Sequence, residues 1–297
     1  MTVLLEWNYG QRTTPGSSNR PKRADGLELK SPGSYTAGME TLTTNSDVCS
    51  AVVQAALDLA QEASQLQFAP PTACIYNPLQ YAWQSHKQYI EKYGAGRKKV
   101  VFLGMNPGPF GMAQTGVPFG EIPAVRDWMG VSAAIEQPGY THPKRPVQGF
   151  ECPRSEVSGR RLWGLMQERF GSAEAFFAEH FVLNYCPLVF MEESSRNRTP
   201  NQLPRHEREQ LFAVCDRHLQ RVIRAMQPDW LIGIGAFASK RAAAAMASTA
   251  TTAASAGAAA QHPRLATVLH PSPASPHANR GWAEQATAQL ITAGVWT

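Results

Sequence analysis

The sequence lacks several features that mark particular classes of protein. Its five cysteines are an odd number, and no two of them form a C-x-x-C pair. This argues against a zinc site, an iron–sulfur cluster or a disulfide framework, and it favours a reducing intracellular compartment. No apolar run reaches the roughly 18 residues of a transmembrane helix, and the N-terminus has neither the apolar length nor the basic start of a signal peptide. We therefore expect no membrane association, no metal and no cofactor.

The bulk composition allows one large domain. The chain has 297 residues, of which 43% are hydrophobic, so a substantial core can form. The formal net charge of +5 is mildly basic, which permits a polyanionic partner without requiring one. Because no sustained heptad repeat is present, we expect a monomer.

Composition divides the chain into a tail and a domain. Residues 1–45 are rich in Gly, Ser, Thr and Pro and are predicted to be a disordered N-terminal tail, and residues 46–297 form the domain. Within the domain, about 242–262 is a low-complexity, Ala-rich insert. Its first half is expected to extend a helix, and its second half is expected to be a surface loop.

Four short β-branched runs are predicted to be strands, and helical patterns separate them. The strands are expected at 99–103, 181–184, 230–234 and 266–269, and the helices at 46–66, 79–93, 159–170, 205–226 and 236–247. Strands that alternate with helices predict an α/β fold, a three-layer α/β/α sandwich with a central four-stranded parallel sheet. His206 and His218 lie on a helix rich in charge and are expected at the surface.

Polar side chains follow three of the predicted strands. Asn106 stands in a loop rich in glycine and proline, Asn184 ends the second strand, and His270 follows the last. Ligands of open parallel sheets bind beyond the carboxyl ends of the strands, so these side chains are expected at one rim. Each residue alone could be a turn former or a structural histidine, but their joint occurrence favours a shared site.

The three side chains define an unusual chemistry. The amide of Asn106 has no titratable group near neutral pH, so it can orient a water molecule but cannot deprotonate it. Asn184 offers a donor and an acceptor, which suits a ring with adjacent N–H and C=O groups. His270 can donate a hydrogen bond to an oxygen that gains negative charge. Such a site fits a reaction whose leaving group is a stabilised heterocyclic anion.

At these residues the sequence resembles the single-strand-selective monofunctional uracil-DNA glycosylases, a family of the uracil-DNA glycosylase superfamily. The similarity runs from about residue 64 to about residue 290. The motifs that carry it are GMNPGPFGMAQTGVPFGE at 104–121, VRDW at 125–128, HPKRPV at 142–147, ECPRSEVSG at 151–159, NYCPL at 184–188, RNRTPNQLP at 196–204 and HPSPASPHANRGW at 270–282.

The resemblance implies a repair enzyme that removes uracil, and oxidised 5-substituted uracils such as 5-hydroxymethyluracil, from single- and double-stranded DNA. It cleaves the N-glycosidic bond and leaves an abasic site for base excision repair. The implied catalytic residues are Asn106, which positions the water, and His270, which stabilises the departing base. The implied base-binding residues are Met105, Gly108, Met112, Phe119 and Asn184.

Basic and polar residues near the motifs are expected to bind DNA phosphates. They are Lys144, Arg145, Arg154, Ser158, Arg160, Arg161, Ser272, His277 and Arg280. A helix starting near His277 could carry a wedge that enters the base stack. The family tends to carry Arg after HPSP, where this chain has Ala274, so insertion into duplex DNA is expected to be weaker or to rely on His277 or Arg280.

Two alternative functions stay open at this point. One is a catalytically weak nucleic-acid-binding relative, and the other is a nucleoside hydrolase with the same pocket. The expected location is the nucleus if the source is eukaryotic and otherwise the cytoplasm or nucleoid. The basic stretch from Arg20 to Arg23 is a weak nuclear-import pattern.

Overall fold

The structure is a computed structural model that describes residues 44–255 and 262–297, with the backbone alone for 249–255. The basic stretch from Arg20 to Arg23, nearly all of the predicted tail and the second half of the Ala-rich insert lie outside these residues. Within the described part, no helix has the length and apolarity to cross a bilayer.

The centre of the domain is a four-stranded parallel sheet with the strand order β3-β2-β6-β7. Its strands are β2 (Val100–Gly104), β3 (His180–Asn184), β6 (Trp230–Ile234) and β7 (Arg264–Val268). Every residue of β2, β3 and β6 is buried, as expected for parallel strands that are covered on both faces. This confirms the predicted sheet, although β7 begins and ends earlier than the sequence pattern indicated.

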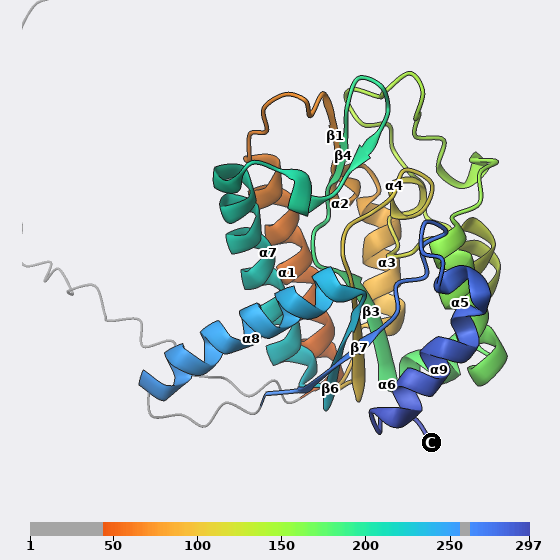
Figure 1. The fold of residues 1–297 in the computed structure, drawn as a ribbon, viewed down its shortest axis with the longest axis vertical. Helices are drawn as coiled ribbons and strands as arrows, with labels where there is room; N and C mark the ends of the chain where they lie inside the picture. Colours follow the sequence, from red (N-terminus) through yellow and green to blue (C-terminus); the bar gives the residue numbers. More distant parts are fainter. Residues whose placement is uncertain (1–43, 256–261) are drawn as a thin grey trace, which may run out of the picture. The chain divides into compact units, whose positions relative to one another are not determined.

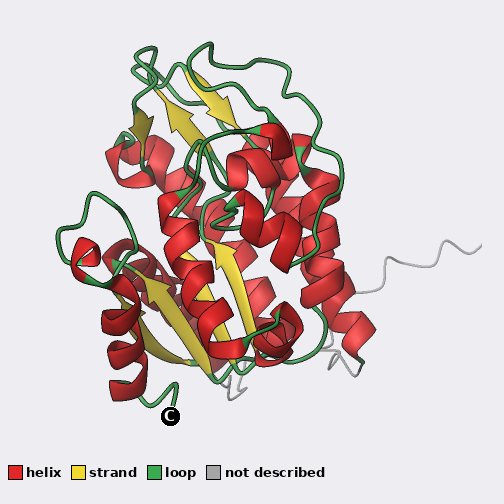
Figure 2. Cartoon of the chain, turned by 90° about the vertical axis from the view of Figure 1, so that its right-hand side faces the viewer, coloured by secondary structure: helices red, strands yellow, loops and turns green. Residues whose placement is uncertain are grey.

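Helices cover both faces of this sheet (Figures 1 and 2). The helices α1 (Asn45–Ser64), α3 (Trp83–Tyr93), α7 (Arg205–Met226) and α8 (Ala236–Ser255) pack in series on one side, where α1 contacts both α3 and α7 and α7 contacts α8. On the other side lie α5 (Val157–Phe170), α6 (Ala173–Glu179) and α9 (Trp282–Thr292). The three-layer α/β/α arrangement is therefore confirmed.

Several boundaries differ from the sequence-based expectation. The N-cap of α1 is Thr44, whose hydroxyl accepts from the Asp47 amide in a capping box, rather than Asn45 or Ser46. The helix expected at 79–93 is split at Ala82 into α2 (Pro78–Tyr81) and α3. A second, antiparallel sheet was not predicted: β1 (Cys74–Tyr76), β4 (Val189–Met191) and β5 (Asn197–Arg198). Helix α4 (Met112–Thr115) was also missed.

The expectation that His218 lies at the surface is wrong. His218 is only 9% exposed, and with His86 it lines a cavity of about 30 Å³ between α1, α3, α7 and β3. Asn184 and Met112 line the same cavity. Burial lowers the pKa of His86 to about 4 and that of His218 to about 3, so both rings are neutral at pH 7. His206, in contrast, is exposed as expected.

These buried histidines make stability depend on pH. Between about pH 4 and pH 6.5 the unfolded chain protonates both rings and the folded chain does not, so stability falls as the pH falls through this window. We predict that His218→Leu reduces the slope of the unfolding free energy against pH in this window by about 1.4 kcal/mol per pH unit. Urea unfolding at several pH values measures it, with His206→Leu on the same helix as the control. Equal slopes for His218→Leu and the wild type would contradict the prediction.

Candidate active site

The sheet brings the three predicted side chains to its carboxyl edge. Asn184 is the last residue of β3 and pairs in register with Gly104 of β2, two residues before Asn106. Two further backbone bonds extend this pairing beyond the strands, from Tyr185 N to Gly104 O (3.0 Å) and from Cys186 N to Met105 O (2.9 Å). The loops after β2 and β3 therefore leave the sheet side by side.

His270 reaches the same edge through a glycine at the end of β6. Gly235 has a φ of +88° and donates its N–H to Val268 O at 2.8 Å. A Cβ added to Gly235 would lie 3.0 Å from His270 Cβ, so only glycine fits both the backbone conformation and the close approach. Phe119 lies beside His270, with 6.2 Å between the ring centroids.

Phe119 and Asn184 meet over Gly104. A Cβ added to Gly104 would lie 2.2 Å from Asn184 Oδ1 and 2.6 Å from Phe119 Cε2. Phe119 has a φ of +53°, which is unfavourable for a bulky residue, and its carbonyl accepts from Trp163 Nε1 (2.9 Å) and Glu121 N (2.7 Å). The surrounding structure thus holds a strained backbone that places this ring over Gly104.

The amide of Asn106 is fixed by its nitrogen. Asn106 Nδ2 donates to Leu188 O at 3.1 Å and lies 3.2 Å from Pro107 O. Within the described residues its Oδ1 has no hydrogen-bond donor, so this oxygen is available to accept from a water molecule.

The amide of Asn184 has only a weak partner. Its side chain is buried, and Nδ2 contacts the thioether sulfur of Met112 at 3.4 Å. Because thioether sulfur is a poor acceptor, a carbonyl oxygen that enters the pocket would be a better one. Met105 and Gly108, on the loop after β2, are half-buried, and a Cβ added to Gly108 would meet nothing within 4 Å.

His270 is held as a neutral donor. Ser272 N donates to Nδ1 at 3.1 Å, so in the neutral ring the hydrogen is on Nε2. Burial lowers the pKa of His270, which keeps the ring neutral at pH 7. The arrangement can therefore offer an N–H to an oxygen that gains charge, an amide to a ring edge and a carbonyl oxygen to a water molecule.

Comparison with known proteins gives this geometry its context. The model of the uracil DNA glycosylase superfamily matches residues 91–291. The single-strand selective monofunctional uracil DNA glycosylase of Mus musculus is 45% identical over 260 residues, which cover 88% of this chain and 90% of that protein. That of Rattus norvegicus is 47% identical over 239 residues, which cover 80% of this chain and 82% of that protein.

The chain belongs to the single-strand selective monofunctional uracil-DNA glycosylase family. The fold is also similar to that of a protein with much lower sequence identity. The crystal structure of wild-type Pedobacter heparinus SMUG2 aligns with a TM-score of 0.52 at 16% identity, and the alignment covers 81% of this chain and 98% of that one. Within the described residues of this family member, no group of three or more His, Cys, Asp or Glu side chains could hold a metal ion.

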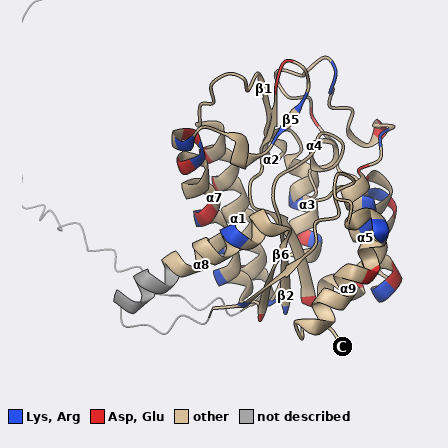
Figure 3. Ribbon diagram, in the orientation of Figure 1, with Lys and Arg blue, Asp and Glu red and all other residues tan. Residues whose placement is uncertain are grey.

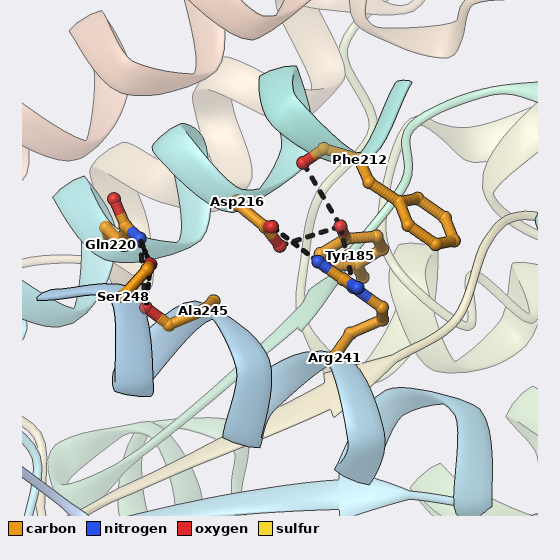
Figure 4. Close-up of polar contacts among 7 residues, drawn as sticks. All are labelled: Tyr185, Phe212, Asp216, Gln220, Arg241, Ala245 and Ser248. Atoms are coloured by element: carbon orange, nitrogen blue, oxygen red, sulfur yellow. Dashed lines mark hydrogen bonds and ion pairs between the residues drawn. The ribbon is translucent and has the colours of Figure 1, made fainter. Parts of the chain in front are cut away.

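A polar network that the sequence did not reveal supports the residue after Asn184 (Figure 4). The Tyr185 hydroxyl donates to Asp216 Oδ1 at 2.7 Å and accepts from Arg241 Nε at 3.0 Å, and Arg241 also pairs with Asp216. Burial raises the pKa of Tyr185, so the phenol stays protonated. The network ties the start of the Asn184 loop to α7 and α8.

The segment after His270 is anchored by an arginine of α5. Arg161 donates to Pro271 O (3.0 Å), Ser272 O (3.3 Å) and Asn279 Oδ1 (2.8 Å). A helix was expected to start near His277. The chain instead forms a 3-10 turn at Ala278–Arg280, and α9 begins only at Trp282.

The other predicted DNA-contact residues lie in different settings. His277 and Arg280 are exposed on the 3-10 turn, and Arg160 is exposed on α5 and donates to Ser155 Oγ at 3.2 Å. Ser158 is buried in the first turn of α5, where its amide donates to Glu156. Lys144 and Arg145 lie on a separate loop, Arg154 is exposed just before α5, and Ser272 is half-buried in the segment after His270.

We predict that Arg161→Gln loosens the loop at 270–280, since it removes the cation that joins three acceptors there. Amide hydrogen exchange of this loop should become faster, while exchange in the sheet stays unchanged. Arg160→Gln is the control, because it removes the same charge from the neighbouring position. Equal protection of the loop in the two variants would show that Arg161 does not hold it.

Proposed function

We propose that this protein is a monofunctional DNA glycosylase that hydrolyses the N-glycosidic bond of uracil, leaving an abasic site for base excision repair. The observation that carries the proposal is that Asn184 and His270 lie beside Phe119 at one edge of the sheet, with Asn106 on the adjoining loop after β2. Family membership supports it, because the relatives are named uracil-DNA glycosylases.

The pocket reads the flipped base through Asn184. Its Oδ1 accepts from uracil N3–H, and its Nδ2 exchanges the Met112 sulfur for the O4 carbonyl. Cytosine presents the opposite pattern and is rejected. Stacking on Phe119 contributes roughly 1–3 kcal/mol and offsets part of the cost of extruding the nucleotide. The Met105 backbone completes the pocket.

The same residues explain the bond cleavage. As the glycosidic bond breaks, its electron pair moves to the base, and the neutral His270 Nε2–H donates to the base oxygen that gains charge. The sugar carbon becomes electron-poor and is captured by a water molecule that Asn106 Oδ1 orients. The amide takes no proton, so the proton of the water leaves to solvent after capture.

The substrate range follows from the space around the base. Gly108 adjoins open space and Met112 has a flexible side chain, which supports acceptance of 5-substituted uracils such as 5-hydroxymethyluracil. Ala274 is exposed and small, which supports weaker insertion into duplex DNA than an arginine at this position would give.

DNA binding is proposed for a set of polar and basic residues around the pocket. The set is Lys144, Arg145, Ser158, Arg160, Arg161, Ser272, His277 and Arg280. The protein would act as a monomer, in the nucleus if its source is eukaryotic.

We predict that Asn106→Ala lowers kcat by about 100-fold or more while DNA binding survives, because the water loses its orientation and the base contacts remain. The assay is release of uracil from a labelled single-stranded oligonucleotide, scored by alkaline cleavage. Asn201→Ala, on an exposed turn, is the control.

Measurements on the wild-type protein distinguish the proposed glycosylase from the two alternative functions. Release that is lost in Asn106→Ala supports a glycosylase with this site. Salt-sensitive DNA binding without release would indicate a nucleic-acid-binding relative, and turnover of free nucleoside that long DNA does not inhibit would indicate a nucleoside hydrolase.

We also predict that Asn184→Asp reduces the preference for uracil over cytosine, because a carboxylate lacks the donor that uracil O4 requires. The measurement is the ratio of kcat/KM on matched oligonucleotides that carry either base. An unchanged ratio would show that Asn184 does not read the base edge.

A further inference from the structure

An aromatic ring and two arginines form a cluster beside the proposed pocket. The guanidinium carbons of Arg145 and Arg154 lie over the Phe110 ring, 5.3 and 5.6 Å from its centroid. Phe110 belongs to the loop that carries Asn106, whereas the arginines come from two other segments. The cluster therefore joins three stretches of the chain at the side of the base site.

A buried glutamine locks two of these stretches together. Gln114 is only 1% exposed, and its Nε2 donates to Pro109 O (2.8 Å) and Pro146 O (3.1 Å), the neighbours of Phe110 and Arg145. Its Oε1 accepts from the amides of Gln148 (2.7 Å) and Gly149 (3.1 Å). All four hydrogen-bonding positions of the amide are used, so the two loops are held in a fixed relation.

A tyrosine fixes the Arg145 loop from its other side. The Tyr76 hydroxyl donates to Arg145 O at 2.6 Å and accepts from His142 N at 2.7 Å. His142 and Arg145 form a β-bridge, which closes a tight turn around Lys144. The backbone that presents Arg145 is therefore ordered before any ligand arrives.

The third stretch packs against the Phe110 loop through a glycine. A Cβ added to Gly111 would lie 2.8 Å from Glu156 Cγ, two residues beyond Arg154. The two carboxylates of this region are already occupied. Glu156 accepts from the Ser158 and Gly159 amides, and Glu121 accepts from Ser155 Oγ and the Glu156 amide.

The two guanidinium groups are consequently left without acidic partners. Within the described residues neither Arg145 nor Arg154 forms an ion pair, whereas Arg198, Arg221 and Arg241 each have one. Arg145 donates only to Lys144 O (3.1 Å), and its buried Nε has no partner in this part of the chain. Two planar cations with unused donors on one ring fit the oxygens of a phosphate.

We propose that Phe110, Arg145 and Arg154 form a clamp for one backbone phosphate of the DNA strand, next to the nucleotide whose base enters the pocket. The proposal rests on the proposed function. Helix α5 connects this clamp to the loop at 270–280, because Arg154 precedes its first turn and Arg161 holds the loop. Figure 3 shows basic residues on α5 and on the loops above it.

The position of the clamp explains binding without a second strand. A single strand could lie on the clamp at one side of the pocket and on the loop at the other, and neither contact requires base pairing. Phosphate contacts of this kind give affinity that falls with salt and does not depend on sequence.

Salt dependence is the first test. We expect Arg154→Gln and Arg145→Gln each to weaken binding of a uracil-free single strand on the order of fivefold, and the double variant to lower the slope of log Kd against log salt by about 0.7, the value for one phosphate on single strands. Arg224→Gln is the control, because Arg224 is exposed on the last turn of α7, next to the opposite end of the sheet, and carries the same charge. Slopes equal to that of the control would overturn the clamp.

Phe110 itself is tested without a change of charge. Phe110→Ala should weaken binding in the wild-type background and have little further effect when Arg145 and Arg154 are both Gln, since the ring acts through the arginines. If the alanine variant does not fold, Phe110→Leu replaces it in the same test, because leucine keeps apolar volume but has no aromatic ring. An equal loss in both backgrounds would contradict the proposal.

The phosphate is located by neutral methylphosphonate linkages placed one at a time beside the uracil. One position should weaken wild-type binding and leave the double variant Arg145→Gln/Arg154→Gln unaffected, and equal losses in both proteins at every position would overturn the clamp. On the uracil substrate the clamp variants should raise KM and keep kcat. A wild type that releases no uracil would instead defeat the proposed function, and the salt slopes of uracil-free DNA would still report on the clamp.

Discussion

The candidate site depends on the close approach of two side chains to the backbone of Gly104. The absence of a side chain there lets the Asn184 amide and the Phe119 ring lie over β2, and the backbone bonds to Gly104 O and Met105 O carry the pairing of β2 and β3 into their loops. Asn106 is therefore placed by main-chain geometry, and its amide nitrogen then bonds back to Leu188 O. A second glycine, Gly235, has no side chain either, and this lets His270 lie close to the end of β6.

The interior of the site is uncharged, and its cations lie around it. Asn106 and Asn184 are amides, and burial keeps His270 neutral, so the residues that would face the base carry no net charge at pH 7. This suits a leaving group that departs as an anion, because a neutral N–H stabilises it without a permanent ion pair in the ground state. Arg145 and Arg154, for which we propose a phosphate contact, form no ion pair within the described residues, so the proposal assigns affinity for the polymer and recognition of the base to separate residues.

The sequence predicted what repeats locally and missed what depends on distant contacts. Buried parallel strands are short apolar runs, so the sheet and the residues at its carboxyl edge could be predicted. Strand β5 has two residues and no pattern of its own. The burial of His218 was missed because the sequence of α7 is rich in charge. The hydrogen bonds that Tyr185 forms with Asp216 and Arg241 span 31 and 56 residues.

The most direct test of the site is a crystal structure of this chain bound to a single-stranded oligonucleotide with a non-hydrolysable uracil nucleotide. The account predicts uracil stacked on Phe119, with N3 and O4 paired to the Asn184 amide, a base oxygen on His270 Nε2 and a water molecule on Asn106 Oδ1. A uracil bound elsewhere, or one in this pocket with Asn184 still turned to Met112, would contradict it.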